Sequence, residues 1–117
     1  MANSEIKMVV GGSIEEDAAA FIGAWKRAER GEQFNERQIA FESWGTLTRV
    51  LTGKRFELLR HLRRHPEPSV LALAKSLGRD YRRVHEDVEV LAGAGLLDKT
   101  TEGLRADYDG LETHITI

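Results

Sequence analysis

The sequence of 117 residues contains no cysteine, which excludes disulfides and thiolate-ligated metal sites. Proline is scarce, and Pro66 predicts the end of the helix before it because its ring cannot continue the hydrogen-bond ladder. No apolar run reaches the ~20 residues that span a bilayer, and no apolar secretory segment stands at the N-terminus. We therefore expect a cytoplasmic protein that makes no contact with membranes.

Motifs for catalysis and cofactor binding are also missing. We find no nucleophile elbow, phosphate-binding glycine loop or dinucleotide motif, and Gly11-Gly12 is too short for such a loop. The histidines are dispersed, and only His61 and His65 have the i,i+4 spacing of a metal-ligand pair. Without a third ligand, the simpler explanation is a pair of solvated residues near a helix C-terminus. The sequence predicts no enzyme, no cofactor and no metal site.

Charge is unevenly distributed, although the net charge is only −2. Nine Lys or Arg residues stand against three acidic residues in the segment 53–85, whereas eight acidic residues stand against two cations from residue 86 onward. Because a local field steers a protein toward phosphates, this segment predicts double-stranded DNA as a partner. A second interpretation, as the solvated face of a helix, stays open for three of the cations: Arg60, Arg63 and Arg64.

Residues 69–97 predict two short amphipathic helices joined at a glycine. Ser69 is a suitable N-cap for the first helix, and Gly78 permits the sharp turn before the second. In the second helix one stripe is expected to be buried: Tyr81, Val84, Val88 and Leu91. A helix whose first residues present positive donors suits the major groove of DNA, where a guanidinium fork matches guanine. The donors expected at this helix start are Arg79, Arg82 and Arg83.

The residues and spacing of this segment, SVLALAKSLGRDYRRVHEDVEVLAGAGLL, resemble the winged helix-turn-helix repressors of the MarR and ArsR type. The run LAGAGLL, residues 91–97, is similar to the end of the recognition helix in that superfamily, with Gly95 as a left-handed C-cap residue. The run GRDYRRVHED, residues 78–87, also resembles small archaeal and bacterial DNA-binding regulators that lie beside toxin-like genes in some genomes. The resemblance implies an α+β fold in which residues 43–117 form a winged helix-turn-helix domain.

The resemblance also implies a wing after the recognition helix. We expect Leu96-Leu97 to start a strand, Glu102-Gly103 to form a hairpin turn, and a final strand to cover residues 112–117. Lys99 and Arg105 flank the tip of this hairpin, where contacts to phosphates or to the minor groove would be made. The predicted DNA-binding residues are Ser69, Arg79, Tyr81, Arg82, Arg83, His85, Glu86, Lys99 and Arg105.

Two further helices are expected at the start of the winged domain. The first is short and covers residues 43–50. The second covers residues 54–65 and places Phe56, Leu59 and Leu62 on one face. This second helix is expected to pack behind the helix-turn-helix pair.

The N-terminal extension predicts a strand, a helix and a second strand. Residues 5–10 alternate as a strand, Ser13 and Glu16 have the spacing of a capping box, and residues 37–41 alternate again. This unit, residues 1–42, buries too little apolar surface to be stable alone, so it must pack on the rest of the chain or on a second copy. Because inverted half-sites require a two-fold partner, we predict a homodimer.

The predicted dimer interface consists of apolar side chains from both strands and the helix of this unit: Ile6, Met8, Phe21, Trp25, Ile39 and Phe41. The alternative is that these side chains fill the core of a single chain. The two alternatives differ in whether the side chains are accessible in one copy.

These patterns lead to one main hypothesis and two alternatives. The main hypothesis is a sequence-specific DNA-binding transcriptional regulator that acts as a homodimer and represses by occupying an operator. The first alternative is an antitoxin-like protein whose N-terminal unit binds a toxin partner, while its winged domain autoregulates the operon. The second is a winged domain that binds only protein, which a recognition helix without arginines would favour. The main hypothesis requires the guanidinium groups that begin at Arg79 to point outward.

Overall fold

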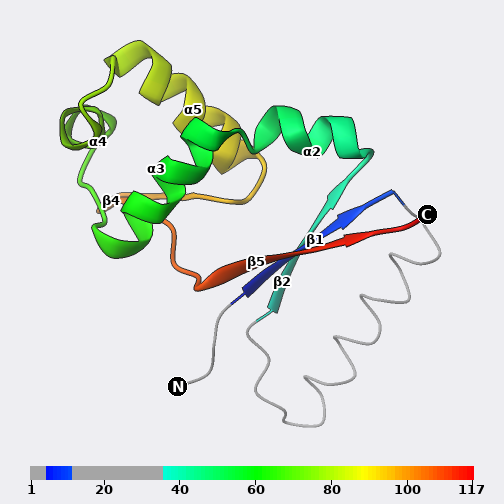
Figure 1. Cartoon of the computed structure of the whole chain (residues 1–117). Helices are drawn as coiled ribbons and strands as arrows, with labels where there is room; N and C mark the ends of the chain where they lie inside the picture. Colours follow the sequence, from blue (N-terminus) through cyan, green and yellow to red (C-terminus); the bar gives the residue numbers. More distant parts are fainter. Residues whose placement is uncertain (1–4, 12–35) are drawn as a thin grey trace, which may run out of the picture.

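The computed structural model describes residues 5–11 and 36–117, which form a small α+β domain (Figure 1). The helix predicted from Ser13 onward lies outside the described residues, and so do Phe21 and Trp25. The described elements follow in the order β1 (Glu5–Val10), β2 (Glu36–Phe41), α2 (Trp44–Val50), α3 (Gly53–Arg64), α4 (Val70–Leu77), α5 (Tyr81–Gly93), β3 (Asp98–Thr100), β4 (Gly103–Arg105) and β5 (Gly110–Ile115).

Three parallel strands form one sheet in the order β2-β1-β5. Figure 1 shows this sheet below the helices, connected to them through α2 and through the chain that leads from β4 to β5. The sheet therefore combines the two N-terminal strands with the last strand of the chain. That strand covers Gly110–Ile115 rather than the predicted residues 112–117, because its partner β1 ends at Val10, opposite Ile115.

A single core joins the sheet to the helices. The predicted alternation of β1 is confirmed, since Ile6, Met8 and Val10 are at most 2% exposed. Phe41 is buried and Ile39 is partly buried in the same cluster. This corrects the predicted dimer interface, because Ile6, Met8 and Phe41 are enclosed within one chain and cannot contact a second copy. For these three side chains, the alternative of a core within one chain holds.

The starts of α2, α3 and α4 are fixed by hydroxyl caps. Ser43, Thr52 and Ser69 each accept a hydrogen bond from the backbone N–H three residues later. These bonds satisfy donors that a helix start would otherwise leave without partners. None of the helices in the described part of the chain has the length and apolar character that crossing a membrane requires.

The buried face of α3 differs from the prediction. Leu58, Leu59 and Leu62 are at most 4% exposed, but Phe56 is 43% exposed. Leu58 occupies the buried face, and Phe56 points about 160° away from it because successive residues turn by about 100° in a helix. Two turns before Leu62, the residue that lies on the buried face is Arg55.

The transition from α5 to the hairpin also differs in detail. Gly95 has the predicted left-handed backbone, with φ of 86°. Leu96 and Leu97 are buried as expected for core residues, but β3 begins only at Asp98. Leu96 is not part of a strand because its N–H donates to the Leu91 carbonyl at 2.9 Å. This hydrogen bond belongs to the C-terminal end of α5.

The β3-β4 hairpin is fixed to the loop between α3 and α4. The Leu104 N–H donates to the Glu67 carbonyl at 2.7 Å, and the Glu67 N–H donates to the Leu104 carbonyl at 3.2 Å. At Gly103, where φ is 134°, an added Cβ would lie 2.2 Å from the Glu67 oxygen. Only glycine fits this approach, so backbone contacts set the orientation of the hairpin. The predicted hairpin is confirmed, but its turn consists of Thr101 and Glu102, because Gly103 already pairs with Thr100 as the first residue of β4.

Tyr108 attaches the chain after β4 to the end of α5, and we predict that its hydroxyl contributes to stability. This hydroxyl donates to the Leu96 carbonyl at 2.8 Å in a buried position. Tyr108→Phe leaves that carbonyl without a partner and should lower the free energy of unfolding by about 1–2 kcal/mol, measured by urea denaturation. Tyr81→Phe is the matched control, because Tyr81 is 47% exposed and should change stability little. Equal loss in both variants would contradict this assignment.

We also predict that the Tyr108 hydroxyl ionises at a higher pH than an exposed tyrosine does. Burial raises the pKa of Tyr108 to about 12. Because the folded pKa lies above the unfolded value of about 10, the contribution to stability is complete below that unfolded value and is lost as the pH rises through the folded one. In the Tyr81→Phe variant Tyr108 is the only tyrosine. Its ultraviolet titration should therefore coincide with unfolding, whereas titration in a folded chain near the unfolded value would contradict the prediction.

Candidate nucleic-acid interface

The turn between α4 and α5 places the first residues of α5. Gly78 ends α4 in the left-handed conformation predicted for it, with φ of 64°. Asp80 is the N-cap of α5, and its carboxylate accepts the Arg83 N–H at 3.2 Å. Arg79 therefore precedes the helix and belongs to the turn. Of the three arginines that were predicted to begin the recognition helix, only Arg82 and Arg83 lie within the first turn of α5.

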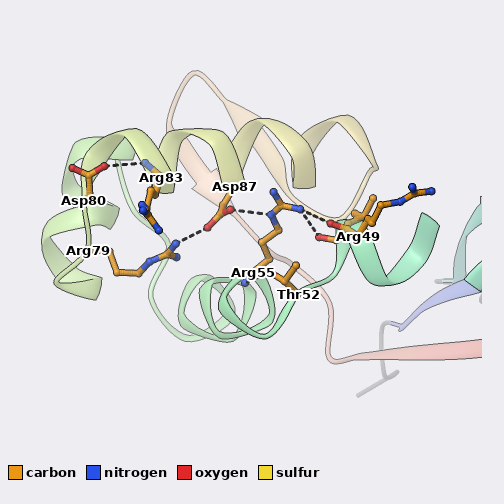
Figure 2. A network of polar contacts seen from close by, with 8 residues as sticks. Arg49, Thr52, Arg55, Arg79, Asp80, Arg83 and Asp87 are labelled. Carbon is orange, nitrogen blue, oxygen red and sulfur yellow. Dashed lines mark hydrogen bonds and ion pairs between the residues drawn. The ribbon is translucent and has the colours of Figure 1, made fainter. Parts of the chain in front are cut away.

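Arg79 does not point outward, which corrects the prediction made for it. Its Nη2 atom donates to Asp87 Oδ2 at 2.7 Å, and its side chain is only 19% exposed. Figure 2 shows the guanidinium lying under α5 against the carboxylate of Asp87. The physical reason is the position of Asp87 on the inner face of α5, which provides the buried counter-charge that Arg79 reaches from the turn.

Asp87 also binds a second arginine, which is Arg55 of α3 (Figure 2). The Nε atom of Arg55 donates to Asp87 Oδ1 at 2.9 Å. The same guanidinium uses Nη1 to donate to the Arg49 carbonyl at 2.7 Å and to the Val50 carbonyl at 3.1 Å. One carboxylate thus connects α3 with the turn before α5, and Arg55 extends the connection to the end of α2. We call Arg55, Arg79 and Asp87 the ion-pair cluster.

Burial makes the ion-pair cluster dependent on its single acid. Asp87 is 9% exposed, and the side chains of both arginines are less than 20% exposed. Among the described residues, Arg79 Nη1 is also buried without a hydrogen-bond partner. A buried charge is costly unless it is paired, and here two cations share one carboxylate. Removing that carboxylate would leave two enclosed guanidinium groups without a counter-charge among the described residues.

The sequence contained a signal for this cluster that the motif-based interpretation missed. Asp87 lies between Val84 and Val88 at the spacing of the buried stripe, and Arg55 lies at the corresponding place before Leu62. A charged residue on an apolar stripe requires a partner of opposite charge. Asp87 and Arg55 carry opposite charges and therefore meet that requirement. Arg79 was instead assigned to DNA because of its neighbours in the sequence.

Arg82 and Arg83 meet the condition that Arg79 does not. Both side chains are exposed, and neither guanidinium has a hydrogen bond or ion pair within the residues that the structure describes. The exposed face of α5 also includes Tyr81, His85 and Glu86. The prediction that Tyr81 belongs to the buried stripe of this helix is wrong, because Tyr81 is 47% exposed, and its ring lies 5.9 Å from that of His85. Tyr81 is the first residue of α5, and the helix enters the core only from Val84 onward, so the Tyr81 ring stays exposed.

A row of contacts joins this face to the hairpin. Glu89 Oε1 lies 3.9 Å from His85 Nε2 and 2.5 Å from Lys99 Nζ. The hydrogen bond and the charge of Lys99 lower the pKa of Glu89. The predicted wing residue Lys99 therefore already has an acidic partner, whereas Arg105 on β4 is exposed. Ser69 is occupied as the cap of α4, since its Oγ accepts the Ala72 N–H at 3.1 Å.

The basic residues of α3 form a separate group. Arg63 bonds to Asp109 and lies 3.8 Å from Asp107, and the bond to Asp109 raises the pKa of Arg63. Arg60 stacks its guanidinium over the ring of Phe56 at 5.9 Å. These contacts are internal to the chain. The contacts of Arg60 and Arg63 agree with the interpretation of this surface as a solvated helix face, whereas Arg64 is exposed and has no hydrogen bond or ion pair within the described residues.

The histidine pair of α3 is placed in a network of its own. His61 Nε2 lies 3.3 Å from Glu67 Oε2, and the rings of His61 and His65 are 5.6 Å apart. In residues 5–11 and 36–117 there is no group of three His, Cys, Asp or Glu side chains that could hold a metal ion.

We predict that the ion-pair cluster is the most sensitive polar site of the fold. Asp87→Asn keeps the shape of the side chain but removes the charge that both arginines share. The free energy of unfolding should fall by about 3–5 kcal/mol, measured by chemical denaturation, because a buried pair is broken on one side only.

Glu86→Gln provides a matched control, because it removes one negative charge from the adjacent, exposed position of α5. Its effect should stay within about 0.5 kcal/mol. If both variants lost the same stability, Asp87 would act only through the overall charge of the helix.

Comparison with known protein families gives a match over the second half of the chain. A protein-family model named HVO_A0114 matches residues 50–113, which is more than half of the chain. The matched segment runs from the last residue of α2 into β5 and contains the whole ion-pair cluster. No curated protein and no solved structure matches the sequence. The chain therefore belongs to the HVO_A0114 family.

Proposed function

We propose that this protein is a DNA-binding transcriptional regulator with a winged helix-turn-helix domain. In this assignment α4 and α5 are the helix-turn-helix pair, α5 is the recognition helix and the β3-β4 hairpin is the wing. The observation that carries the proposal is the pair of exposed guanidinium groups, Arg82 and Arg83, in the first turn of α5. They have no partner within the described part of the chain.

The chemistry of this helix start suits the major groove. A guanidinium can donate two parallel hydrogen bonds to O6 and N7 of guanine, or it can bind a phosphate. His85, one turn later, is half exposed and can donate to a base or a backbone oxygen. Glu86 is exposed and can accept from the N4 amino group of cytosine. Tyr81 adds an exposed phenol that suits a phosphate.

The ion-pair cluster gives Arg79 a different role in this proposal. Arg79 is a positioning residue, because its bond to Asp87 fixes the turn that leads into α5. Rigid placement matters, since base readout depends on hydrogen-bond geometry. The assignment of Arg79 to direct DNA contact is therefore replaced by indirect support of Arg82 and Arg83.

The proposal includes repression by a homodimer that occupies an operator. Two recognition helices related by a two-fold axis would enter successive major grooves, about one helical turn apart. The hairpin would lie over the flanking backbone, with Arg105 as its exposed cation. Selection of bound fragments from a random DNA pool is the direct test. An enriched inverted repeat supports the proposal, and failure to enrich any sequence contradicts it.

We predict that Arg82→Ala and Arg83→Ala each weaken binding to the selected site. A guanidinium that reads a base contributes about 1–3 kcal/mol, so the dissociation constant should rise roughly tenfold to a hundredfold. Fluorescence anisotropy with the selected duplex and with a scrambled duplex measures the effect. A larger loss on the selected duplex indicates base readout, and equal losses on both indicate phosphate contact.

Arg49→Ala is the control for this experiment. Arg49 is also exposed, but it lies on α2, where its side chain donates to Thr46 Oγ1 at 3.3 Å. This variant has the same change in net charge as the other two. If it weakened binding as much as Arg82→Ala does, the assignment of α5 as the contact helix would be wrong.

A further inference from the structure

The outer edge of β5 has an unusual sequence for an exposed strand. β5 is the last strand of the sheet order β2-β1-β5, so one of its edges faces no strand in the described residues. From Glu112 to Ile115 every side chain is exposed, including Ile115 at 45%. An exposed edge that carries an apolar residue is a template for pairing with another strand.

The backbone groups that point outward from this edge follow from the register. The Thr116 N–H donates to the Val10 carbonyl at 3.1 Å, and Val10 stands opposite Ile115. Because backbone groups alternate between the two edges of a strand, Glu112 and His114 also direct their N–H and C=O groups to β1. The residues that direct theirs away from β1 are Leu111, Thr113 and Ile115.

The side chains along this edge are complementary to themselves about Thr113. In an antiparallel pair of two copies centred there, Leu111 stands opposite Ile115 of the second copy, and Glu112 stands opposite His114 of the second copy. We propose that the chain forms a homodimer by pairing β5 with β5 of a second copy in this register. The two sheets then join into one continuous sheet, in the order β2-β1-β5-β5-β1-β2.

The hydrogen-bonding pattern agrees with this centre. Thr113 and its counterpart both direct their backbone groups outward, so they exchange two N–H···O=C bonds across the two-fold axis. Leu111 and Ile115 form the next hydrogen-bonded pairs on either side. Glu112 and His114 become the closer pairs without backbone hydrogen bonds, where side-chain charge has the strongest effect.

The neighbouring registers are disfavoured by charge and by apolar exposure. Centring on Glu112 places the two copies of Glu112 opposite each other, and centring on His114 does the same for His114. Two carboxylates in directly opposite positions repel each other, so the register centred on Glu112 is destabilised by charge. Both shifts also separate Leu111 from Ile115. Within one chain, Lys7 of β1 stands beside Glu112, and Val9 stands beside His114.

This inference rests on the proposed function only where that function requires two-fold symmetry. It replaces the interface predicted at Ile6, Met8 and Phe41, which are enclosed in the core of one chain. The face of β5 that carries Leu111, Thr113 and Ile115 continues the face of β1 that carries the core residues. Pairing at this edge therefore covers Ile115 without exposing any part of that core.

The first test measures the oligomeric state of the full chain without DNA, by light scattering after size exclusion. The natural sequence should be a dimer at micromolar concentration. Thr113→Pro removes only an outward-facing N–H, which the bond to β1 does not use, so it should give a folded monomer. Leu104→Ala, a core substitution away from this edge, serves as a control for nonspecific destabilisation and should stay dimeric. A monomeric natural chain, or a dimeric Thr113→Pro variant, overturns the proposal.

A charge exchange tests the register independently of proline. Glu112→His and His114→Glu each place like residues opposite each other in both symmetric pairs. Each should raise the dissociation constant of the dimer about tenfold, because two pairs are affected. The double variant, Glu112→His with His114→Glu, restores opposite residues and should recover the dimer. Additive losses in the double variant contradict the register.

A crosslink tests the two-fold centre directly, because the chain has no cysteine of its own. In Thr113→Cys the two introduced thiols lie across the axis, where Cα atoms of a hydrogen-bonded pair are about 5.5 Å apart, within disulfide range. Ile115→Cys is the control, since its two copies lie about 14 Å apart along the strands. Oxidation should crosslink the first variant and leave the second uncrosslinked. The reverse result places the axis elsewhere.

These outcomes are separable from those of the DNA-binding proposal. A dimer through β5 that binds no DNA leaves this inference intact and contradicts the proposed function. If the chain binds DNA but the Thr113→Pro variant is still a dimer, the proposed function is supported and this inference is contradicted.

Discussion

The position of α5 depends on one carboxylate that two arginines share. Asp87 receives a hydrogen bond from Arg55 of α3 and another from Arg79 of the turn before α5. Because all three side chains are largely buried, neither arginine can exchange this acid for water at low cost. The helix start is thereby held against α3, while Leu91 and its apolar neighbours hold the rest of α5 by burial. Charge sets the orientation, and apolar packing supplies most of the stability.

The cations of the basic segment therefore differ in their surroundings. Arg55, Arg79 and Arg63 are bound to acids of the same chain. Arg82 and Arg83 in the first turn of α5 are exposed, as is Arg64 of α3, and none of these three side chains has a hydrogen bond or ion pair within the described residues. A count of positive charges along the sequence treats all of them alike and overstates the field that a duplex would meet. In the proposed function, the fixed turn before α5 keeps Arg82 and Arg83 at one place on the surface.

Much of the local structure was predictable because it depends on neighbouring residues. Ser69 caps α4, Gly78 adopts left-handed backbone, and Ile6, Met8 and Val10 share the buried side of β1, as expected from residue type and spacing. The left-handed backbone of Gly95 was expected from the resemblance to winged helix-turn-helix repressors. The errors concern contacts between distant elements. Phe56 is turned outward because Leu58 occupies the buried face of α3, and Arg79 is turned inward because Asp87 lies eight residues later on the inner side of α5. Spacing within one helix does not decide which face meets the rest of the fold.

The sequence by itself determined the elements, their caps and the alternation of the strands, since these follow from backbone hydrogen bonding and side-chain periodicity over a few residues. It also determined that charge gathers in residues 53–85. Only the tertiary structure decided which of these charges are neutralised and that β5 pairs with β1 across most of the chain length. The reason is physical: pairing of buried charges and of strand edges depends on distances between segments that only folding brings together.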